Sequence, residues 1–369
     1  MRRVACIAGA RPNFVKMGPV LRGLEKAGVP TTLIHTGQHY DAAMSDLFFE
    51  QLNLPKPDVH LEVGSGSHGA QTARILERYE SWLLEQETKP AATLVVGDVN
   101  STVACALAST KLHVPVIHVE AGLRSLDRAM PEEINRVLTD AISELLLVSE
   151  PSGLEHLRHE GRPEDAIRLV GNVMIDVLKA QLPKARELRV LADAGVEAGG
   201  YVLCTLHRPS NVDEPAQLER LARALLAIAR QLPVVFPVHP RTRGRLDSAG
   251  LLEELESATG VRLLEPQGYL EFLSLSSQAR VIVTDSGGLQ EESTVLGIPC
   301  LTMRENTERP ITVSEGTSTL VGTDTEKLVA LVDEVLAGRY KQGRAPELWD
   351  GCAGERVGVE VAAFLERAC

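Results

Sequence analysis

Short apolar runs alternate with amphipathic stretches along almost the whole chain of 369 residues. Apolar runs of four to eight residues are typical of buried strands, and apolar residues at spacings of three and four are typical of helices. The apolar runs predict strands at 4–8, 31–35, 93–97, 115–119, 144–148, 166–170, 201–206, 233–238, 261–264, 280–284 and 299–303. Strands that alternate with helices form parallel βαβ units, so the pattern predicts an α/β protein.

The helical pattern is clearest in three places. Apolar residues recur on one side at Leu218, Leu221, Leu225 and Ile228, at Leu328, Leu331 and Val335, and at Val357, Val361 and Phe364. The strand pattern pauses over residues 171–200 and restarts at Tyr201. This restart, and a strand number that is high for one sheet, predict two domains with a boundary near Val173.

The amino-acid composition limits which binding partners and which cellular compartment we expect for the protein. The formal net charge is −12, which argues against broad binding to nucleic acid or to an anionic membrane. The six cysteines are scattered without a CxxC or a Cys/His cluster, so we expect no metal site, no disulfide framework and a cytoplasmic location. No apolar run approaches a membrane span, and the first residues favour a strand over a signal peptide.

Acidic and basic residues crowd the segment HVEAGLRSLDRAMPEEINR, residues 118–136, between a predicted strand and a predicted helix. Such connections line the ligand crevice of an open α/β sheet. Glu120 ends its strand, Glu132 begins the helix, and Asp98 ends a neighbouring strand. An Asp before a helix is most often an N-cap, and Glu132 also suits the helix dipole. Packed together, the three carboxylates would raise one another's pKa values, as general acids require.

A glycine-rich turn follows the strand at 280–284 and leads directly into a helix, in the segment TDSGGLQEE. Glycines allow a ligand to approach the backbone, and the free N–H groups of a helix N-terminus bind phosphate. Ser286 offers a hydroxyl next to Gly287 and Gly288, and Glu292 offers a carboxylate for ribose hydroxyls. The structural alternative is a helix start with favourably placed acids, and the segment is not a dinucleotide or NTP motif.

Basic residues follow several other predicted strands. Arg11 and Lys16 follow the first strand, and the second half adds His207, Arg208, His239, Arg241, Arg243, Arg304 and Arg309. Any one of them is more often a surface charge. Strand ends of one sheet converge, so together they predict a site for a small, multiply charged anion.

These segments together resemble the UDP-N-acetylglucosamine 2-epimerase family. The matching pieces are GARPNFVKMGPV, TGQHYDAAM, VVGDVNST, HVEAGLRS, MPEEINR, HRPSN, PVHPR, TDSGGLQEE and RENTERP, in the family's order and over most of the chain. The resemblance implies two Rossmann-like domains facing a cleft, the glycosyltransferase-B-type fold. Residues 1–172 with a returning C-terminal helix at 355–369 would form one domain, and residues 173–354 would bind UDP.

The resemblance also assigns roles to residues. It implies catalytic roles for Asp98, Glu120, Glu132 and His207, and contacts to the UDP-sugar from Arg11, Lys16, Gln267, Phe272, Ser286, Gly287, Gly288, Glu292 and Arg309. The implied reaction inverts carbon 2 of the sugar by eliminating UDP to give 2-acetamidoglucal and adding UDP back, without a cofactor. A homodimer is expected on the same basis and because two-fold homo-oligomers are common.

Four alternatives remain open. A hydrolysing 2-epimerase would release N-acetylmannosamine, and a related epimerase would act on a UDP-2,3-diacetamido uronic acid. A glycosyltransferase of the same fold needs an acceptor but does not need three carboxylates around C2. A nucleotide-sugar sensor would not need any of the three carboxylates. The segment GQHYDAAM departs from the QHRxML-type segment of members with an allosteric site, which argues against allosteric activation.

Overall fold

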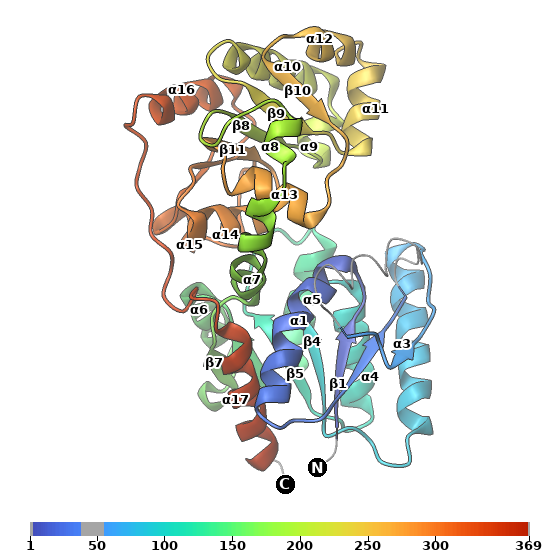
Figure 1. Ribbon diagram of the computed structural model, residues 1–369. Coiled ribbons are helices and arrows are strands. Elements are labelled where there is room, and N and C mark those ends of the chain that lie inside the picture. Colours follow the sequence, from blue (N-terminus) through green and yellow to red (C-terminus); the bar gives the residue numbers. More distant parts are fainter. Residues whose placement is uncertain (1–2, 38–54, 368–369) are drawn as a thin grey trace. The chain divides into compact units, whose positions relative to one another are not determined.

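The computed structural model describes residues 3–37 and 55–367, apart from the side chains of Arg11 and Pro12. The chain divides into two compact units (Figure 1). Unit 1 comprises Met1–Val177 and Glu347–Cys369, and unit 2 comprises Leu178–Pro346. Each unit is described by itself below.

Unit 1 contains a sheet of parallel strands in the order β3-β2-β1-β4-β5-β6-β7. Its strands are β1 (Val4–Ala8), β2 (Thr31–His35), β3 (Val59–His60), β4 (Ala92–Val96), β5 (Val116–Ala121), β6 (Leu145–Val148) and β7 (Ile167–Leu169). Its helices are α1 (Arg11–Lys26), α3 (His68–Glu85), α4 (Asn100–Lys111), α5 (Pro131–Ile142), α6 (Pro151–His159), the 3₁₀ turn η1 (Glu164–Ala166) and α17 (Ala353–Arg367).

Unit 2 has a sheet of the same design, with parallel strands in the order β10-β9-β8-β11-β12-β13. Its strands are β8 (Val202–Thr205), β9 (Val234–Pro237), β10 (Val261–Leu264), β11 (Val281–Thr284), β12 (Cys300–Thr302) and β13 (Ser318–Leu320). Its helices are α8 (Val190–Asp193), α9 (Pro209–Val212), α10 (Pro215–Ala229), α11 (Pro240–Ser248), α12 (Leu252–Ser257), α13 (Tyr269–Ser276), α14 (Gly287–Leu296), α15 (Ile311–Ser314) and α16 (Thr325–Leu336).

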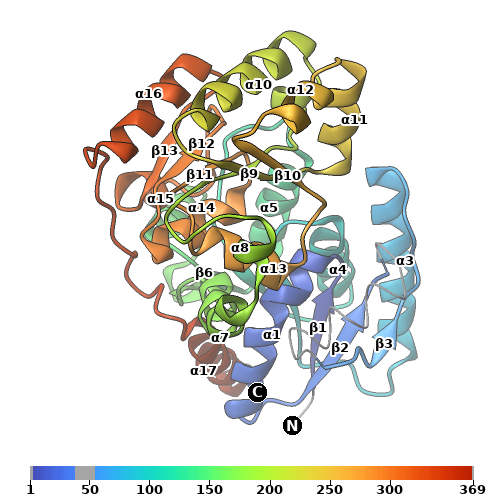
Figure 2. The same ribbon diagram turned by 45° about the horizontal axis from the view of Figure 1, so that its top comes forward.

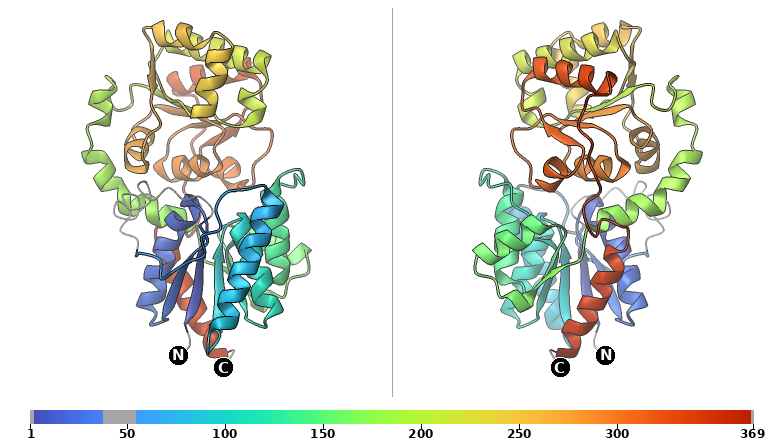
Figure 3. Two further views of the ribbon diagram at one scale, coloured as in Figure 1. Left: turned by 90° about the vertical axis from the view of Figure 1, so that its right-hand side faces the viewer. Right: turned by 90° about the vertical axis from the view of Figure 1, so that its left-hand side faces the viewer.

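Helices cover both faces of each sheet because successive strand residues point to opposite sides. In β1, Val4 and Cys6 pack with α1 and α17, whereas Ala5 and Ile7 pack with α3 and α4. The two pairs of helices therefore cover opposite faces of the sheet (Figure 3). In unit 2, α10 and α16 bury one face of the sheet, and α13 and α14 bury the other (Figure 2). The two parallel-sheet α/β units confirm the predicted fold class.

The predicted strands and amphipathic helices are present, including the buried faces of α10, α16 and α17. The short strands β3 and β13 were not predicted, because two or three residues are too few to show a periodicity. The units divide inside α7 (Val173–Glu187), a few residues after the predicted boundary. The chain returns to unit 1 at Glu347 instead of at residue 355, and the buried Trp349 donates to the Ser149 carbonyl at 3.0 Å.

Candidate active-site residues

In unit 1 the strand order reverses between β1 and β4, and ligands of open α/β sheets bind beyond the carboxyl ends of strands at such a point. Three predicted site residues lie here. Lys16 comes from α1, Asp98 follows β4 and Glu120 lies near the end of β5. Lys16 Nζ forms an ion pair with Glu120 Oε2, and the Glu120 side chain is 6% exposed.

The backbone at Glu120 has a conformation that is rare for a residue with a side chain. Its φ angle is 70°, and the pairing of β5 with β6 shifts register between Val119 and Ala121. An irregularity of this kind changes the direction in which a side chain points, and such strain concentrates at functional sites. The geometry therefore supports a functional role for Glu120.

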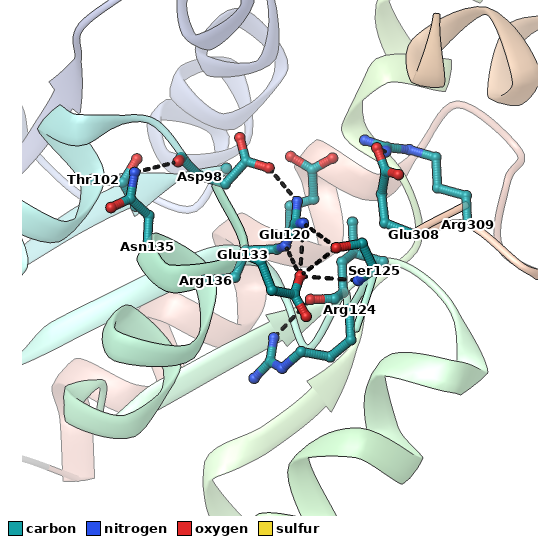
Figure 4. A network of polar contacts seen from close by, with 12 residues as sticks. Asp98, Thr102, Glu120, Arg124, Ser125, Glu133, Asn135, Arg136, Glu308 and Arg309 are labelled. Atoms are coloured by element: carbon teal, nitrogen blue, oxygen red, sulfur yellow. Dashed lines mark hydrogen bonds and ion pairs between the residues drawn. The ribbon is translucent and has the colours of Figure 1, made fainter. Parts of the chain in front are cut away.

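Asp98 is not an N-cap, so the structural alternative that base rates favoured is wrong. Helix α4 begins at Asn100 with Val99 as its N-cap. The carboxylate of Asp98 instead accepts a hydrogen bond from Arg136 Nη1 at 2.5 Å, and its backbone carbonyl accepts one from Asn135 Nδ2 at 2.9 Å (Figure 4). The side chain is 30% exposed, so it remains accessible.

Arg136 also holds the loop before α5. Its Nε and Nη2 groups donate to Glu133 Oε2 at 3.0 and 2.7 Å (Figure 4). Glu133 in turn accepts from the backbone N–H groups of Ser125 and Leu126. Burial alone would raise the pKa of Glu133, but hydrogen bonds from Ser125 and Arg136 lower it below its ordinary value. The loop is therefore fixed by charged groups.

A second network, buried except at Glu160, lies behind the strand ends. The ring of His118 contacts Asp140 Oδ1 at 2.6 Å through Nδ1 and the Gly97 carbonyl at 2.9 Å through Nε2. Arg124 pairs with Asp140 at 2.7 Å and with Glu160. Burial alone would raise the pKa of Asp140, but His118 and Arg124 lower it. The network anchors Gly97, the residue before Asp98.

Each of the two carboxylates at the strand ends of unit 1 has a cation beside it. Glu120 has Lys16 as its partner and Asp98 has Arg136, and a nearby cation favours the ionised form of a carboxylate. Glu132 lies in the first turn of α5, half-buried, and makes no side-chain hydrogen bond or ion pair with the described residues.

Two parts of the predicted site lie partly or wholly outside the residues that the structure describes. Arg11 is the first residue of α1, but its side chain lies outside what the structure describes. Residues 38–44 of the segment GQHYDAAM also lie outside the described residues.

In unit 2 the strand order reverses between β8 and β11, and Asp285 and His207 lie at these two strand ends. Asp285 is completely buried and accepts from His207 Nδ1 at 2.9 Å and from the backbone N–H of Arg208 and the side chain of Asn211. Burial alone would raise the pKa of Asp285, but these hydrogen bonds, led by that of His207, lower it. The His207 side chain is 43% exposed, so its outer nitrogen is available to a ligand.

Of the other basic residues predicted at the strand ends of unit 2, some lie near His207 and others pair with carboxylates elsewhere. The His239 ring lies 5.7 Å from the His207 ring, and burial followed by the charge of His207 lowers the pKa of His239. In contrast, Arg241 pairs with Asp213, and Arg243 pairs with Glu256 and Glu265. These two arginines are therefore held by surface carboxylates.

The glycine turn leads directly into α14, with Ser286 as the N-cap residue. The Ser286 side chain makes no capping hydrogen bond, so its hydroxyl is not committed to the helix. A Cβ added at Gly287 would meet Glu308 Oε1 at 2.9 Å, whereas a Cβ at Gly288 would meet nothing within 4 Å. A side chain at the first glycine would therefore press on the ion pair of Glu308 and Arg309, whereas the second glycine borders open space.

Arg309 lies in a buried group of alternating charges. It pairs with Glu291 and with Glu308 at 2.7 Å (Figure 4), and Glu308 also pairs with Arg304 at 2.7 Å. Burial alone would raise the pKa of Glu308, but the two arginines lower it strongly. Arg309 was predicted to contact the diphosphate. In the structure, Glu291 and Glu308 already neutralise part of its positive charge.

Glu292 is buried one turn further along α14 and accepts a hydrogen bond from Tyr269 of α13 at 3.2 Å. Burial raises the pKa of Glu292 to about 7. The other two predicted ligand contacts flank Tyr269: Gln267 donates to the Glu265 carbonyl at 2.7 Å, and Phe272 packs partly buried against the apolar cluster below α13.

Sequence reasoning missed several residues of these networks, above all Arg136, Asp285 and Asp140. Asp285 carried a signal, since it follows a strand and precedes a helix. Arg136 and Asp140 lie inside a helix with no distinguishing local pattern. Over residues 3–37 and 55–367, no group of three or more His, Cys, Asp and Glu side chains is arranged to hold a metal ion. Among the helices described, none is both long and apolar enough for a membrane span.

Comparison with known proteins gives a consistent result. The family model described as UDP-N-acetylglucosamine 2-epimerase matches residues 22–361. A UDP-N-acetylglucosamine 2-epimerase of Methanocaldococcus jannaschii is 42% identical over 360 residues, which are 96% of this chain and 97% of the relative. A UDP-2,3-diacetamido-2,3-dideoxy-D-glucuronate 2-epimerase of Pseudomonas aeruginosa is also 42% identical, over 89% of this chain and 90% of the relative.

The structure gives the same answer. The crystal structure of the M. jannaschii UDP-GlcNAc 2-epimerase in complex with UDP-GlcNAc and UDP matches with a TM-score of 0.86 and 41% identity, over 98% of this chain and 99% of the other. The match extends over both α/β units, which confirms the resemblance seen in the sequence motifs. This chain belongs to the UDP-N-acetylglucosamine 2-epimerase family.

Proposed function

We propose that the protein interconverts UDP-N-acetylglucosamine and UDP-N-acetylmannosamine without hydrolysing them. The observation that carries the proposal is the pair of carboxylates, Asp98 and Glu120, each held beside a cation at the switch point of the unit 1 sheet. Family membership supports action on a UDP-sugar.

The expected homodimer can be tested by light scattering.

The proposed reaction proceeds by elimination because the C2 proton is not adjacent to a carbonyl and is not acidic. The C1–O bond breaks and its electron pair leaves on the β-phosphate of UDP. A carboxylate takes the C2 proton, and the C2–H electron pair forms the C1=C2 bond of 2-acetamidoglucal. Protonation of C2 from the opposite face and return of UDP to C1 then give the epimer. Carboxylates suit both proton transfers.

The diphosphate part of this proposal rests on unit 2. The N-terminus of α14 offers backbone N–H groups, and Gly288 leaves open space beside them. His207, held by Asp285, provides a side chain that can stabilise charge on the leaving diphosphate. The Glu292 carboxylate is proposed to accept from the ribose. Arg309 would add positive charge within unit 2. On the family resemblance, Lys16 and Arg11 are also proposed to contact the UDP-sugar.

NMR in D₂O tests the proposal with UDP-N-acetylglucosamine as the only substrate. We expect deuterium at C2 and a mixture of UDP-linked gluco and manno sugars. Free N-acetylmannosamine would instead show the hydrolysing reaction. The absence of exchange until a sugar acceptor is added would show a glycosyltransferase, and the absence of exchange under both conditions would contradict catalysis on this sugar.

A second candidate substrate is a UDP-2,3-diacetamido uronic acid, because the P. aeruginosa relative with that activity in its name is as similar as the M. jannaschii one. Both substrates carry the 2-acetamido group and the UDP, so the proposed chemistry at C1 and C2 is common to them. Measurement of kcat/KM for both sugars decides between them, and a higher value for the uronic acid would replace the first proposal.

A further inference from the structure

We infer that Arg136 is a positioning residue that holds Asp98 as an ionised, correctly oriented carboxylate. The inference rests on the proposed function of Asp98 and extends it to a residue that does not itself contact the sugar. It is carried by contacts within unit 1 alone.

Arg136 is in direct contact with the Asp98 side chain. Its side chain is 3% exposed, and Nη1 lies 2.5 Å from Asp98 Oδ2. The preceding residue, Asn135, donates to the backbone carbonyl of Asp98 at 2.9 Å. Two consecutive residues of α5 therefore hold the main chain and the carboxylate of one residue 38 positions earlier in the sequence.

The Arg136 guanidinium is itself held in place by hydrogen bonds, so it fixes the direction of the Asp98 carboxylate. Its Nε and Nη2 groups bind Glu133, and Glu133 binds the backbone of the loop at Ser125 and Leu126. The planar guanidinium fork can bind two carboxylates in fixed directions at once, whereas a lysine ammonium cannot reproduce both contacts.

The same helix carries Glu132, four residues before Arg136. Residues at this spacing lie on the same side of a helix. The contact between Arg136 and Asp98 therefore fixes the position of Asp98 relative to α5, which carries a second of the three proposed catalytic carboxylates. Loss of Arg136 would change the position of Asp98 relative to Glu132 without removing either carboxylate.

Other charged groups act on Asp98 besides Arg136. Glu133 faces the same guanidinium from α5, and Lys16 of α1 and Glu120 of β5 lie beside the neighbouring Gly97. His118 of β5 binds the Gly97 carbonyl. Arg136 is in direct contact with the carboxylate, so its removal should shift the titration of Asp98 to higher pH by about 1–3 pH units.

The first measurement does not depend on activity. The full-length protein is labelled with ¹³C at the aspartate carboxyls, and the Asp98 signal is assigned by its loss in Asp98→Asn. We expect Asp98 to titrate at higher pH in Arg136→Met than in the unmodified protein. Glu133→Gln is the matched control, because it loosens the same loop but retains the contact of Arg136 with Asp98.

The second measurement is turnover of UDP-N-acetylglucosamine. In Arg136→Met we expect kcat to fall by about a hundredfold, within the range for general acid–base groups, while KM changes less than threefold. Arg136→Lys should recover part of the loss and also serves if the Met variant does not fold. Glu133→Gln should lower kcat by less than Arg136→Met.

The outcomes separate the inference from the proposed function. If Asp98 titrates at the same pH in the unmodified protein and in both Arg136 variants, the inference is wrong. It is also wrong if Glu133→Gln lowers kcat as much as Arg136→Met without moving the Asp98 titration. If the unmodified protein does not turn over the sugar, the proposed function fails, and the carboxyl titration still decides the role of Arg136.

Discussion

The two sheets reverse their strand order in the same way, but the residues at the two reversal points differ in kind. In unit 1 the strand ends present Asp98 and Glu120, each next to a cation. In unit 2 they present a glycine turn at a helix N-terminus and His207, which is held by a buried aspartate. Under the proposed function, one architecture would support two chemistries, because function depends on the side chains at the strand ends and not on the fold.

Under the proposed function, this contrast places proton transfer in unit 1 and binding of UDP in unit 2. Asp98→Asn and Glu120→Gln should each lower turnover by roughly 10²–10⁴-fold, because an amide can neither take nor give the proton. UDP affinity, measured by calorimetry, should stay within a few-fold of that of the unmodified protein. Unchanged turnover in either variant would remove that residue from the mechanism.

Within unit 1, buried and accessible aspartates should behave differently. Asp140→Asn should lower the free energy of unfolding by about 3–5 kcal/mol, because it leaves His118 and Arg124 buried without their carboxylate. Asp98→Asn should lower it far less, because Asp98 is partly exposed. Urea unfolding of the two variants checks this, and equal losses would show that Asp98 is structural as well.

In unit 2, Glu292 should make stability depend on pH. The folded protein retains a proton on Glu292 up to a pKa of about 7, whereas the unfolded chain loses it near 4.5. The unfolded state therefore binds fewer protons in this window, and stability falls as pH rises from about 4.5 to 7. The contribution is on the order of 3 kcal/mol.

Glu292→Gln is the control for this pH effect, because the amide does not titrate. Urea unfolding of both proteins between pH 5 and pH 8 should show the unmodified protein losing stability relative to the variant. A difference that stays constant across this range would mean that Glu292 is ionised in the folded protein throughout.

Gly288 should separate binding from folding in unit 2. A methyl group at this position meets no protein atom within 4 Å, so Gly288→Ala should fold normally and gain up to about 1 kcal/mol as a helix residue. If the open space receives the diphosphate, UDP affinity should fall at least about tenfold, or 1.4 kcal/mol.

Gly244→Ala is the matched control, since Gly244 is a helix residue of unit 2 with equally open surroundings. It should change the helix without changing UDP affinity. Calorimetric titration with UDP measures both variants, and full affinity in Gly288→Ala would move the binding site away from this turn.

Local patterns were sufficient for much of the fold and for the positions of the candidate residues. Apolar runs located the longer strands, and the placement of Glu120 at a strand end singled it out before its backbone was known. The base rate for an Asp before a helix favoured an N-cap as the structural alternative for Asp98, and this alternative is wrong, because an Asp two residues before a helix looks the same in sequence whether it caps the helix or binds a distant arginine.

The sequence by itself determined the order of strands and helices, the predicted pair of α/β domains and the set of polar residues at strand ends. Periodicity and turn chemistry are properties of a few neighbouring residues, so they can be read along the chain. Only the tertiary structure decided the partners: Lys16 meets Glu120 across 104 residues, and Arg136 meets Asp98 across 38. These pairs depend on which strands become neighbours and on a register shift at Glu120, and packing over the whole sheet sets both.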